Sequence, residues 1–351
     1  MVLLKKTDAD LYIANCNNII QCNLNDNTDV QVSIPYDVKN VTSLEFSASQ
    51  EYILISTENK QIIIYDKDFK VVKQFVVNRS PSKACFTPSN DIVVADKTGD
   101  VYLYKLQDQD SKPVMLLGHL SVVLDILISK CGKYIITSDR DEKIRVSHFP
   151  NCYNIVSYCL GHTEFVTKID IIDNTLVSAS GDGTIRFWDF MNGKQLALID
   201  TNSYIEGDNL LQNFCDEMNK EKVEIVALPV TDMQLHLDKH LYIAVSIYKY
   251  DCIQLYSVDL SNFNLTLVTT LKVALPSTFC FENNLFVLSD RLSKYTLVDN
   301  SFVESIEPLF VELYQKYKSL VQFADSNAVA VLYKRKYDNV QEYLERKKQR
   351  L

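Results

Sequence analysis

Long hydrophobic runs are missing from this sequence: it has no stretch of 18 or more uncharged apolar residues, so we expect no membrane span. The three apolar residues between Met1 and Lys5 are too few for the core of a signal peptide. The nine cysteines are odd in number and scattered, and no CxxC pair occurs. This usage favours reduced thiols inside a cell over a disulfide framework.

Motifs of catalysis are missing too. No GxGxxG loop follows a predicted strand, so we expect no binding site of that type for a dinucleotide or for S-adenosylmethionine. No GxSxG occurs either, so we expect no nucleophile elbow of a hydrolase. His236 and His240 have HxxxH spacing, but no Glu or Cys completes a metal set. The sequence therefore predicts a binding module rather than an enzyme.

Composition places the chain among ordinary folded proteins. Of 351 residues, 47% are hydrophobic and 23% are charged, which excludes wholesale disorder. The net charge of -9 makes the chain a poor nucleic-acid binder on its own, because attraction to phosphates needs clustered positive charge. The 20 Tyr and 16 Phe favour strands.

An internal repeat is the strongest signal. An apolar run, a polar turn and an alternating run recur with starts 39, 43 and 41 residues apart. Weaker copies raise the number of predicted hairpins to seven, at 10–24, 52–67, 91–106, 134–149, 175–190, 240–256 and 284–297. A β-hairpin period near 40 predicts an all-β, seven-bladed β-propeller, because each sheet needs neighbours to cover its faces. We expect the ring to close by pairing N-terminal strands with strands near 320–333, which removes two free sheet edges.

One domain is expected over residues 1–333. The segment 201–222 holds five acidic and two basic residues and predicts a solvated loop insertion with at most one helical turn. Residues 334–351 form a basic tail. Asp338 and the apolar positions 340, 343 and 344 predict a short amphipathic helix in it.

Two repeats carry more detailed motifs. Gly118-His119 and Gly161-His162 precede successive hairpins, and the second hairpin ends in Trp188-Asp189. This pattern resembles the WD40 repeat. The resemblance implies that His162 is hydrogen-bonded to Ser178 and Trp188 inside its blade. The matching set in the preceding blade is His119, Thr137 and Ser147.

A narrower resemblance rests on four segments. Residues 138–147, 160–166, 180–188 and 332–344 are similar to the WDR4/wuho/Trm82 family, the non-catalytic subunits of tRNA (guanine-N7-)-methyltransferase. The resemblance implies a heterodimer with a separate Rossmann-type methyltransferase, which alone binds S-adenosylmethionine, and no cofactor on this chain. The pair would form N7-methylguanosine at position 46, in the variable loop of tRNA. The nucleus is the expected location, with the cytoplasm as a second one.

The expected docking surface centres on Lys168. In the family, the interface includes a basic residue just after the GHTEFV stretch, and Lys168 holds that position here. The residues alone favour the interpretation that Lys168 is one of many surface lysines. The resemblance instead implies that Lys168 pairs with a carboxylate of the partner. The neighbouring turn 139–143 alternates in charge and is either a self-paired solvated turn or a contact beside Lys168. The predicted partner-binding residues are Asp139, Arg140, Asp141, Glu142, Lys143, Glu164, Phe165 and Lys168.

The C-terminal tail is the one basic element. Residues 333–351 carry seven Lys or Arg and three acids, a local charge of +4 (7 − 3). The tail is either a solvated end, a contact with tRNA phosphates or a nuclear-import signal. The candidate tRNA-binding residues are Lys334, Arg335, Lys336, Arg346, Lys347, Lys348 and Arg350.

Two other functions fit a propeller. A generic WD40 adaptor, such as a ubiquitin-ligase substrate receptor or a chromatin scaffold, explains the repeats but not the family-specific segments. A propeller enzyme needs acid-rich inner strands that converge on the central channel, and the sequence shows no such set.

Overall fold

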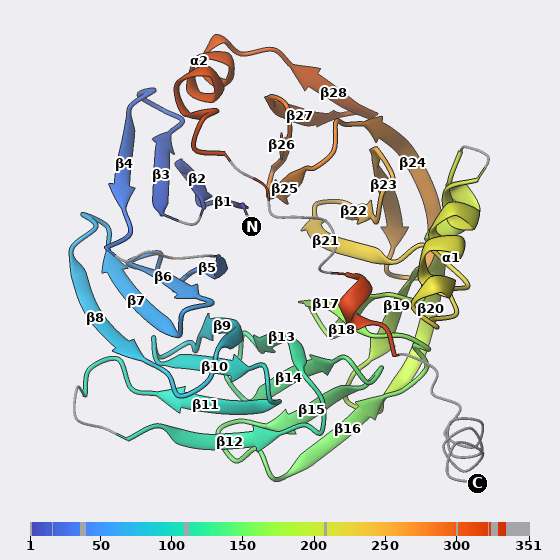
Figure 1. Ribbon diagram of the computed structural model, residues 1–351, viewed down its shortest axis with the longest axis horizontal. Coiled ribbons are helices and arrows are strands. Elements are labelled where there is room, and N and C mark those ends of the chain that lie inside the picture. The colour runs from blue at the N-terminus through green and yellow to red at the C-terminus, as the bar shows by residue number, and fades with distance from the viewer. Residues whose placement is uncertain are drawn as a thin grey trace, which may run out of the picture.

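Seven four-stranded antiparallel sheets surround a central axis in the computed structural model (Figure 1). The structure describes residues 2–15, 17–35, 40–108, 112–206, 209–299, 301–321, 323 and 329–334. Each sheet is one blade made of four consecutive strands, and its two middle strands form one of the hairpins predicted from the repeat. The prediction of a seven-bladed propeller is confirmed.

The first four blades span residues 3–159. Blade 1 contains β1 (Leu3–Lys6), β2 (Asp10–Ala14), β3 (Asn18–Asn23) and β4 (Asp29–Ser33). Blade 2 contains β5 (Val41–Phe46), β6 (Tyr52–Thr57), β7 (Gln61–Asp66) and β8 (Val71–Val76). Blade 3 contains β9 (Pro81–Phe86), β10 (Ile92–Asp96), β11 (Asp100–Tyr104) and β12 (Val114–Gly118). Blade 4 contains β13 (Val123–Ile128), β14 (Tyr134–Asp139), β15 (Ile144–His148) and β16 (Ile155–Cys159).

The last three blades span residues 166–305. Blade 5 contains β17 (Val166–Ile172), β18 (Thr175–Ser180), β19 (Thr184–Asp189) and β20 (Lys194–Asp200). Blade 6 contains β21 (Val230–Leu237), β22 (Leu241–Ile247), β23 (Cys252–Asp259) and β24 (Asn264–Lys272). Blade 7 contains β25 (Thr278–Phe281), β26 (Asn284–Leu288), β27 (Leu292–Val298) and β28 (Ser301–Ser305).

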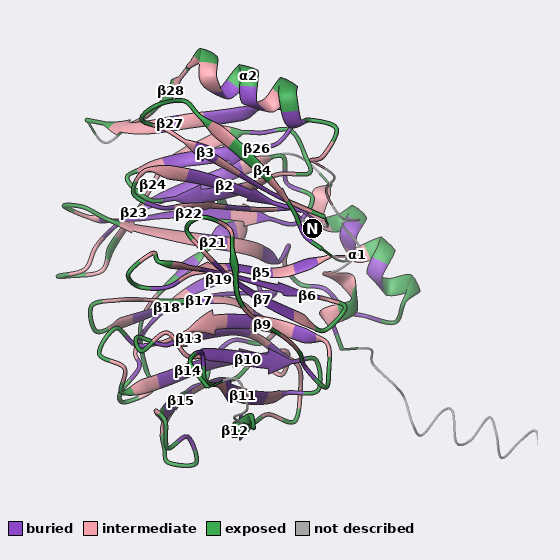
Figure 2. Ribbon diagram, turned by 90° about the vertical axis from the view of Figure 1, so that its left-hand side faces the viewer, coloured by how far each residue is buried: buried purple, intermediate pink, exposed green. Residues whose placement is uncertain are grey.

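Burial follows the position of a strand in its blade. The first strand of each blade lies nearest the axis and the fourth lies at the rim (Figure 1). The second strands are almost wholly buried, as in β6, because neighbouring blades cover both of their faces (Figure 2). The rim strand β8 alternates between exposed and half-buried residues, since one of its faces meets solvent.

The predicted strand exchange at the closure of the ring is wrong. Blade 1 obtains its innermost strand from the first residues of the chain, because the four residues of β1 are enough to pair with β2. No strand occurs among the described residues near 320–333. The seam is closed instead by apolar packing of Leu11 and Ile20 of blade 1 with Phe286 and Leu288 of blade 7.

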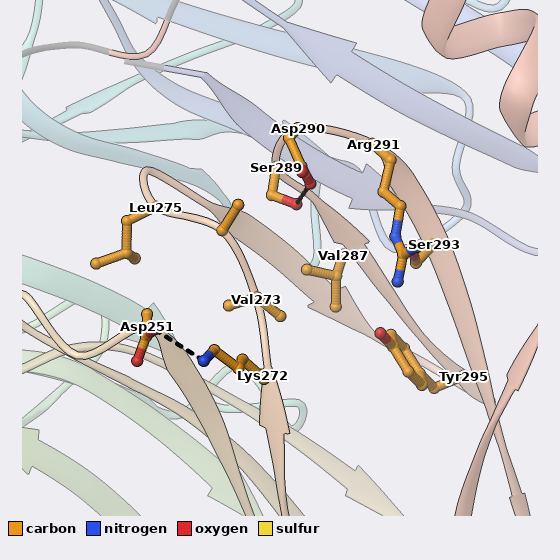
Figure 3. A pocket seen from close by; sticks show the side chains of 11 residues that line it. Asp251, Lys272, Val273, Leu275, Val287, Ser289, Asp290, Arg291, Ser293 and Tyr295 are labelled. Carbon is orange, nitrogen blue, oxygen red and sulfur yellow. Dashed lines mark hydrogen bonds and ion pairs between the residues drawn. The ribbon is translucent and has the colours of Figure 1, made fainter. Parts of the chain in front are cut away.

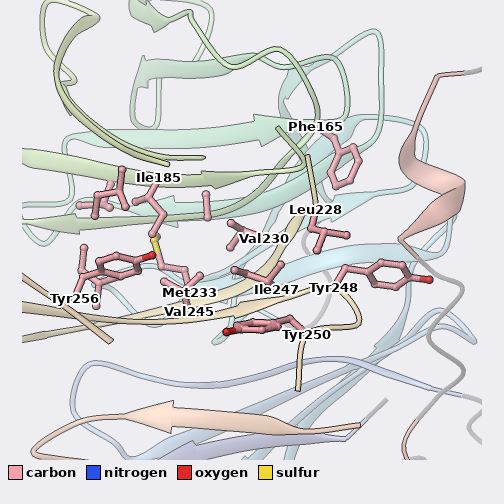
Figure 4. Packing of buried hydrophobic residues seen from close by; sticks show 14 of the residues in the cluster. Phe165, Ile185, Leu228, Val230, Met233, Val245, Ile247, Tyr248, Tyr250 and Tyr256 are labelled. Carbon is pink, nitrogen blue, oxygen red and sulfur yellow. The ribbon is translucent and has the colours of Figure 1, made fainter. Parts of the chain in front are cut away.

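The insertion is more ordered than predicted. A 3-10 helix, η1 (Thr201–Tyr204), is followed by the 11-residue helix α1 (Leu210–Lys220). Phe214 and Met218, one turn apart, are buried in the apolar cluster of blades 5 and 6, part of which Figure 4 shows. The prediction of a loop followed the acidic composition of residues 201–222 and missed the apolar face of α1 that Phe214 and Met218 form.

In the described residues after the last blade, the structure has the helices α2 and η3. Helix α2 (Pro308–Tyr317) packs over the seam between blades 1 and 7, and η3 (Ala330–Leu332) lies beside blade 5 and α1 (Figure 1). The predicted basic helix at the C-terminus lies outside the described residues. None of the helices in the described part of the chain is long and apolar enough to cross a membrane.

Candidate functional site

A buried hydrogen-bond chain fixes the end of blade 5. The indole Nε1 of Trp188 donates to Ser178 Oγ at 2.8 Å, and Ser178 Oγ lies 2.7 Å from His162 Nε2. His162 Nδ1 lies 2.9 Å from Asp182. Burial lowers the pKa of His162, which favours a neutral ring that donates to Asp182 and accepts from Ser178. The predicted structural trio is therefore present, with Ser178 as its central member.

Asp182 is the fourth member, which the sequence analysis missed. Burial alone would raise its pKa, but hydrogen bonds from His162 and Thr184 hold it at about 2. In blade 4, His119 Nδ1 lies 2.8 Å from Asp139 and Nε2 lies 2.8 Å from Thr137. In both blades the Asp follows the His by 20 residues, a spacing that would have revealed it.

Two of the predicted contacts in blade 4 are wrong. Ser147 does not join His119; its hydroxyl accepts from Arg145 Nε at 2.9 Å. Asp139 was expected on the docking surface, but its side chain is buried against His119 because the imidazole needs an acceptor.

Lys168 lies on β17, the innermost strand of blade 5 (Figure 1). Its Nζ is 3.2 Å from Asp232 on β21 of the next blade, and 31% of its side chain is exposed. Asp232 raises the pKa of Lys168 against the opposing effect of burial, so the ammonium is firmly charged. The strand is irregular at its start, where a bulge lies between Val166 and Lys168 and Val166 is fully buried in the core.

The pair of Lys168 and Asp232 ends an arc of charges on the inner strands. Lys5 of β1 meets Glu45 of β5 at 3.2 Å, and Glu45 meets Lys83 of β9 at 2.7 Å. Lys83 then lies 3.6 Å from Asp125 of β13, which accepts the backbone N–H of Ile169 on β17 at 3.1 Å. The arc thus links six successive blades.

The expectation that the inner strands carry no converging acids is therefore wrong. The sequence hides this arrangement because the charges of the arc are about 40 residues apart in the first five blades, and 64 residues separate Lys168 from Asp232 across the insertion. Burial would raise the pKa of Glu45, but Lys5 and Lys83 hold it at about 2. In the described part of the chain, no three His, Cys, Asp or Glu side chains are placed to hold a metal ion. The arc joins blades through ion pairs between its own members and, between blades 4 and 5, through the hydrogen bond from the backbone N–H of Ile169 to Asp125.

The charged turn between β14 and β15 contacts the chain's own C-terminal segment. Arg140 Nε donates to the carbonyl of Leu332 at 2.8 Å and Nη2 to that of Tyr333 at 3.1 Å. The ammonium of Lys334 pairs with Glu142 at 2.7 Å and lies 3.5 Å from Asp141. The turn is therefore not simply self-paired, since it holds the chain's own C-terminal segment.

Tyr333 is the apolar anchor of that segment. Its ring packs edge-on against Phe165 at 4.9 Å between centroids and against Phe214 of α1 at 6.1 Å. Its hydroxyl donates to the carbonyl of Gly181 at 3.1 Å. Phe165 was predicted to touch the partner, but it is fully buried beneath Tyr333 and so is not available at the surface. We call residues 140–142, Phe165 and Phe214, together with the segment 329–334 that they hold, the C-terminal clamp.

The remaining predicted site residues are two candidates for partner binding, Glu164 and Lys143, and the candidates for tRNA binding. Glu164 is half-buried beside the clamp, and burial and then Glu142 raise its pKa to about 7. Lys143 is exposed, and its ammonium donates to the carbonyl of Asp141 in the same turn at 3.1 Å. Of the predicted tRNA-binding residues, Lys334 is described, and those outside the described residues are Arg335, Lys336, Arg346, Lys347, Lys348 and Arg350.

Comparison with known proteins connects this arrangement to a family. Residues 107–277 match the family model described as the tRNA methyltransferase TRM82 WD40 domain. The "tRNA (guanine-N(7)-)-methyltransferase non-catalytic subunit wuho" of Culex quinquefasciatus is 30% identical over 89% of this chain and 76% of its own length. The wdr4 subunit of Danio rerio is 29% identical over 90% of this chain and 78% of its own length. The chain belongs to the family of tRNA (guanine-N(7)-)-methyltransferase non-catalytic subunits.

Solved structures similar to this non-catalytic subunit support its fold alone. A chain of the mitotic checkpoint complex matches with a TM-score of 0.68 and 14% identity over 85% of this chain and 90% of its own. The β-propeller domain of Cps50 (Swd1) from Myceliophteria thermophila matches with a TM-score of 0.63 and 12% identity over 87% of this chain and 96% of its own. The family resemblance seen in the sequence and the propeller fold are both confirmed.

A surface pocket of about 440 Å³ lies between blades 6 and 7 of the subunit (Figure 3). Its wall carries two cations, Lys272 and Arg291, and two acids, Asp251 and Asp290. Lys272 lies 3.9 Å from Asp251, and Arg291 lies 3.0 Å from Glu304. The formal charges of the four ionisable side chains that line the pocket therefore sum to zero.

Proposed function

We propose that this chain is the non-catalytic partner of a separate methyltransferase, with which it forms a heterodimer that makes N7-methylguanosine in tRNA. The observation that carries the proposal is the similarity to non-catalytic subunits over 89% of the chain. The methyl donor, S-adenosylmethionine, binds to the partner, and tRNA is held by the complex. The family resemblance and the basic residues after 333 support a nuclear location, with the cytoplasm as a second one.

Lys168 is the residue that docks the partner. Its ammonium is charged, partly exposed and fixed by Asp232, so little side-chain entropy remains to be lost when a carboxylate of the partner joins it. Val166, two residues earlier, is the first residue of β17 and pairs with Ser180, the last residue of β18. Lys168 therefore lies close to the end of its blade at which the β18–β19 turn is found. Glu164 and the clamp flank this position. A rigid dock acts on catalysis by holding the partner's catalytic groups in place, where a shift of about 1 Å costs on the order of 100-fold in rate.

The proposal is tested by purifying the chain with the catalytic subunit and measuring N7-methylguanosine in tRNA. We expect the intact chain to stimulate methylation and Lys168→Glu to abolish the effect. If the docking pair is buried in the complex, the loss is about 2–5 kcal/mol of binding free energy, or a rise of at least ~30-fold in Kd. Equal binding by wild type and Lys168→Glu would exclude the docking role.

Lys168→Glu also breaks the pair with Asp232, so a matched control is needed. The double variant Lys168→Glu/Asp232→Lys restores an ion pair between β17 and β21 with the charges exchanged. We expect it to recover the thermal stability of the wild type but not the binding of the partner. Asp232→Asn leaves Lys168 in place and is expected to keep binding.

A further inference from the structure

The pocket between blades 6 and 7 lies at the end of blade 6 that carries Asp232, the ion-pair partner of Lys168. Asp232 of β21 pairs with Ser246, the second-last residue of β22. The connection from β22 to β23 contains Asp251, whose backbone carbonyl accepts the N–H of Val273 at 2.8 Å. Asp251 and Val273 both line the pocket. A protein that docks on Lys168 therefore comes close to the pocket.

The charged side chains of the pocket already have partners within the protein. The ammonium of Lys272 lies 3.9 Å from Asp251, and Arg291 Nη2 lies 3.0 Å from Glu304. Asp290 accepts a hydrogen bond of 3.0 Å from the hydroxyl of the preceding serine. A ligand of this pocket therefore does not have to supply a counter-charge to these groups.

Tyr295 is the polar residue of the pocket that lacks a partner. Only 6% of its surface is exposed, and its hydroxyl forms no hydrogen bond within the part of the chain that the structure describes. Figure 3 shows this hydroxyl pointing into the pocket, toward Arg291. The hydroxyl of a buried tyrosine usually has a hydrogen-bond partner, and here the partner has to come from a ligand in the pocket or from water.

The pocket also has an apolar surface. Val273 and Val287 are buried, and Figure 3 shows them between Tyr295 and Leu275, which is 47% exposed. The volume of about 440 Å³ lies in the range of about 300–1,000 Å³ that is common for ligand pockets. An apolar side chain can cover this surface, while a peptide carbonyl next to it accepts the hydrogen bond of Tyr295. A peptide segment with an apolar side chain therefore fits the pocket.

We propose that this pocket is a second docking site, which takes an apolar side chain and the adjacent peptide carbonyl from a segment of the docked catalytic subunit. The inference rests on the proposed function, in which Lys168 holds that subunit next to blade 6. The apolar side chain covers Val273, Leu275 and Val287, and this burial supplies affinity. The hydrogen bond of Tyr295 fixes the orientation of the segment.

The first test removes the hydroxyl of Tyr295 and measures the Kd of the full chain for the purified catalytic subunit. Because this hydroxyl has no partner in the described protein, Tyr295→Phe should keep the melting temperature of the wild type. We expect it to raise the Kd by about two- to tenfold, the effect of one hydrogen bond. Tyr104→Phe, the same change on β11 of blade 3, is the matched control and should bind like the wild type.

The second test places a charge on the apolar surface. Leu275→Asp should fold, since Leu275 is half-exposed, and it should raise the Kd by at least ~10-fold because the carboxylate would be buried against an apolar side chain. Val303→Asp is the matched control: Val303 is 52% exposed on β28, the outer strand of blade 7, and its variant should bind like the wild type.

A cross-link identifies the occupant of the pocket. A photoreactive amino acid in place of Leu275 should, in the purified complex, join one segment of the catalytic subunit, which mass spectrometry locates. The proposal is overturned if this cross-link does not reach the catalytic subunit, or if either Tyr295→Phe or Leu275→Asp binds as tightly as its control. Failure of the catalytic subunit to bind the wild type would instead refute the proposed function.

Discussion

Replacing Ser178 by alanine should cost far more stability than the loss of one surface hydroxyl. Ser178 Oγ is the shared partner of Trp188 Nε1 at 2.8 Å and of His162 Nε2 at 2.7 Å, and all three side chains are buried. Ser178→Ala leaves two buried polar groups without their partner. At about 1–3 kcal/mol for each, the expected loss is about 2–6 kcal/mol in the free energy of unfolding.

Blade 4 supplies a built-in comparison. There the hydroxyl of Thr137 is hydrogen-bonded to His119 and no tryptophan joins them, so Thr137→Ala should cost about 1–3 kcal/mol, roughly half as much. A double-mutant cycle isolates the indole: in the background of Trp188→Phe, the cost of Ser178→Ala should fall to a similar value.

The assay is urea unfolding followed by far-UV circular dichroism, which does not depend on the single tryptophan. All variants should unfold with the same dependence on urea, so that differences in midpoint report stability. The reasoning is refuted if Ser178→Ala lies within about 0.5 kcal/mol of the wild type. It is also refuted if Trp188→Phe leaves the cost of Ser178→Ala unchanged.

Three other results are expected. The pKa of Glu164 is raised to about 7, so this carboxyl binds a proton more tightly in the folded protein than in the unfolded chain. The destabilisation of the folded state by Glu164 therefore grows as pH rises from about 4.5 through 7. Glu164→Gln should raise the melting temperature at pH 8 and not at pH 4, and an equal shift at both values would contradict this. The pKa of Glu45 is held at about 2, so its pairs contribute about 3 kcal/mol above pH 4.5 that is lost as pH falls toward 2. The free energy of unfolding of Glu45→Gln should not show this loss between pH 4.5 and 2, and a pH profile like that of the wild type would argue against the arc. Finally, Tyr333→Phe should raise amide hydrogen exchange in residues 329–334 because the bond to Gly181 is lost, whereas identical exchange would argue that the ring alone holds the segment.

The sequence by itself determined the repeating unit. Each predicted hairpin is a local structure, with strand residues and turn residues adjacent in the chain, so the period of about 40 residues and the alternation within 175–190 were enough to find all seven. The Gly-His and Trp-Asp pairs further indicated the buried trio of blade 5. Lys168 was singled out through the family resemblance, by its position just after the GHTEFV stretch.

Only the tertiary structure decided how these units are joined. The ring closes through apolar packing between the first and last blades, and a strand of four residues completes blade 1. The arc from Lys5 to Asp232 and the contact of Arg140 with Tyr333, 193 residues apart, join segments that no local pattern relates. Such contacts form because the closed ring brings the ends of distant blades side by side, and the same geometry joins the charged turn 139–143 to the chain's own C-terminal segment.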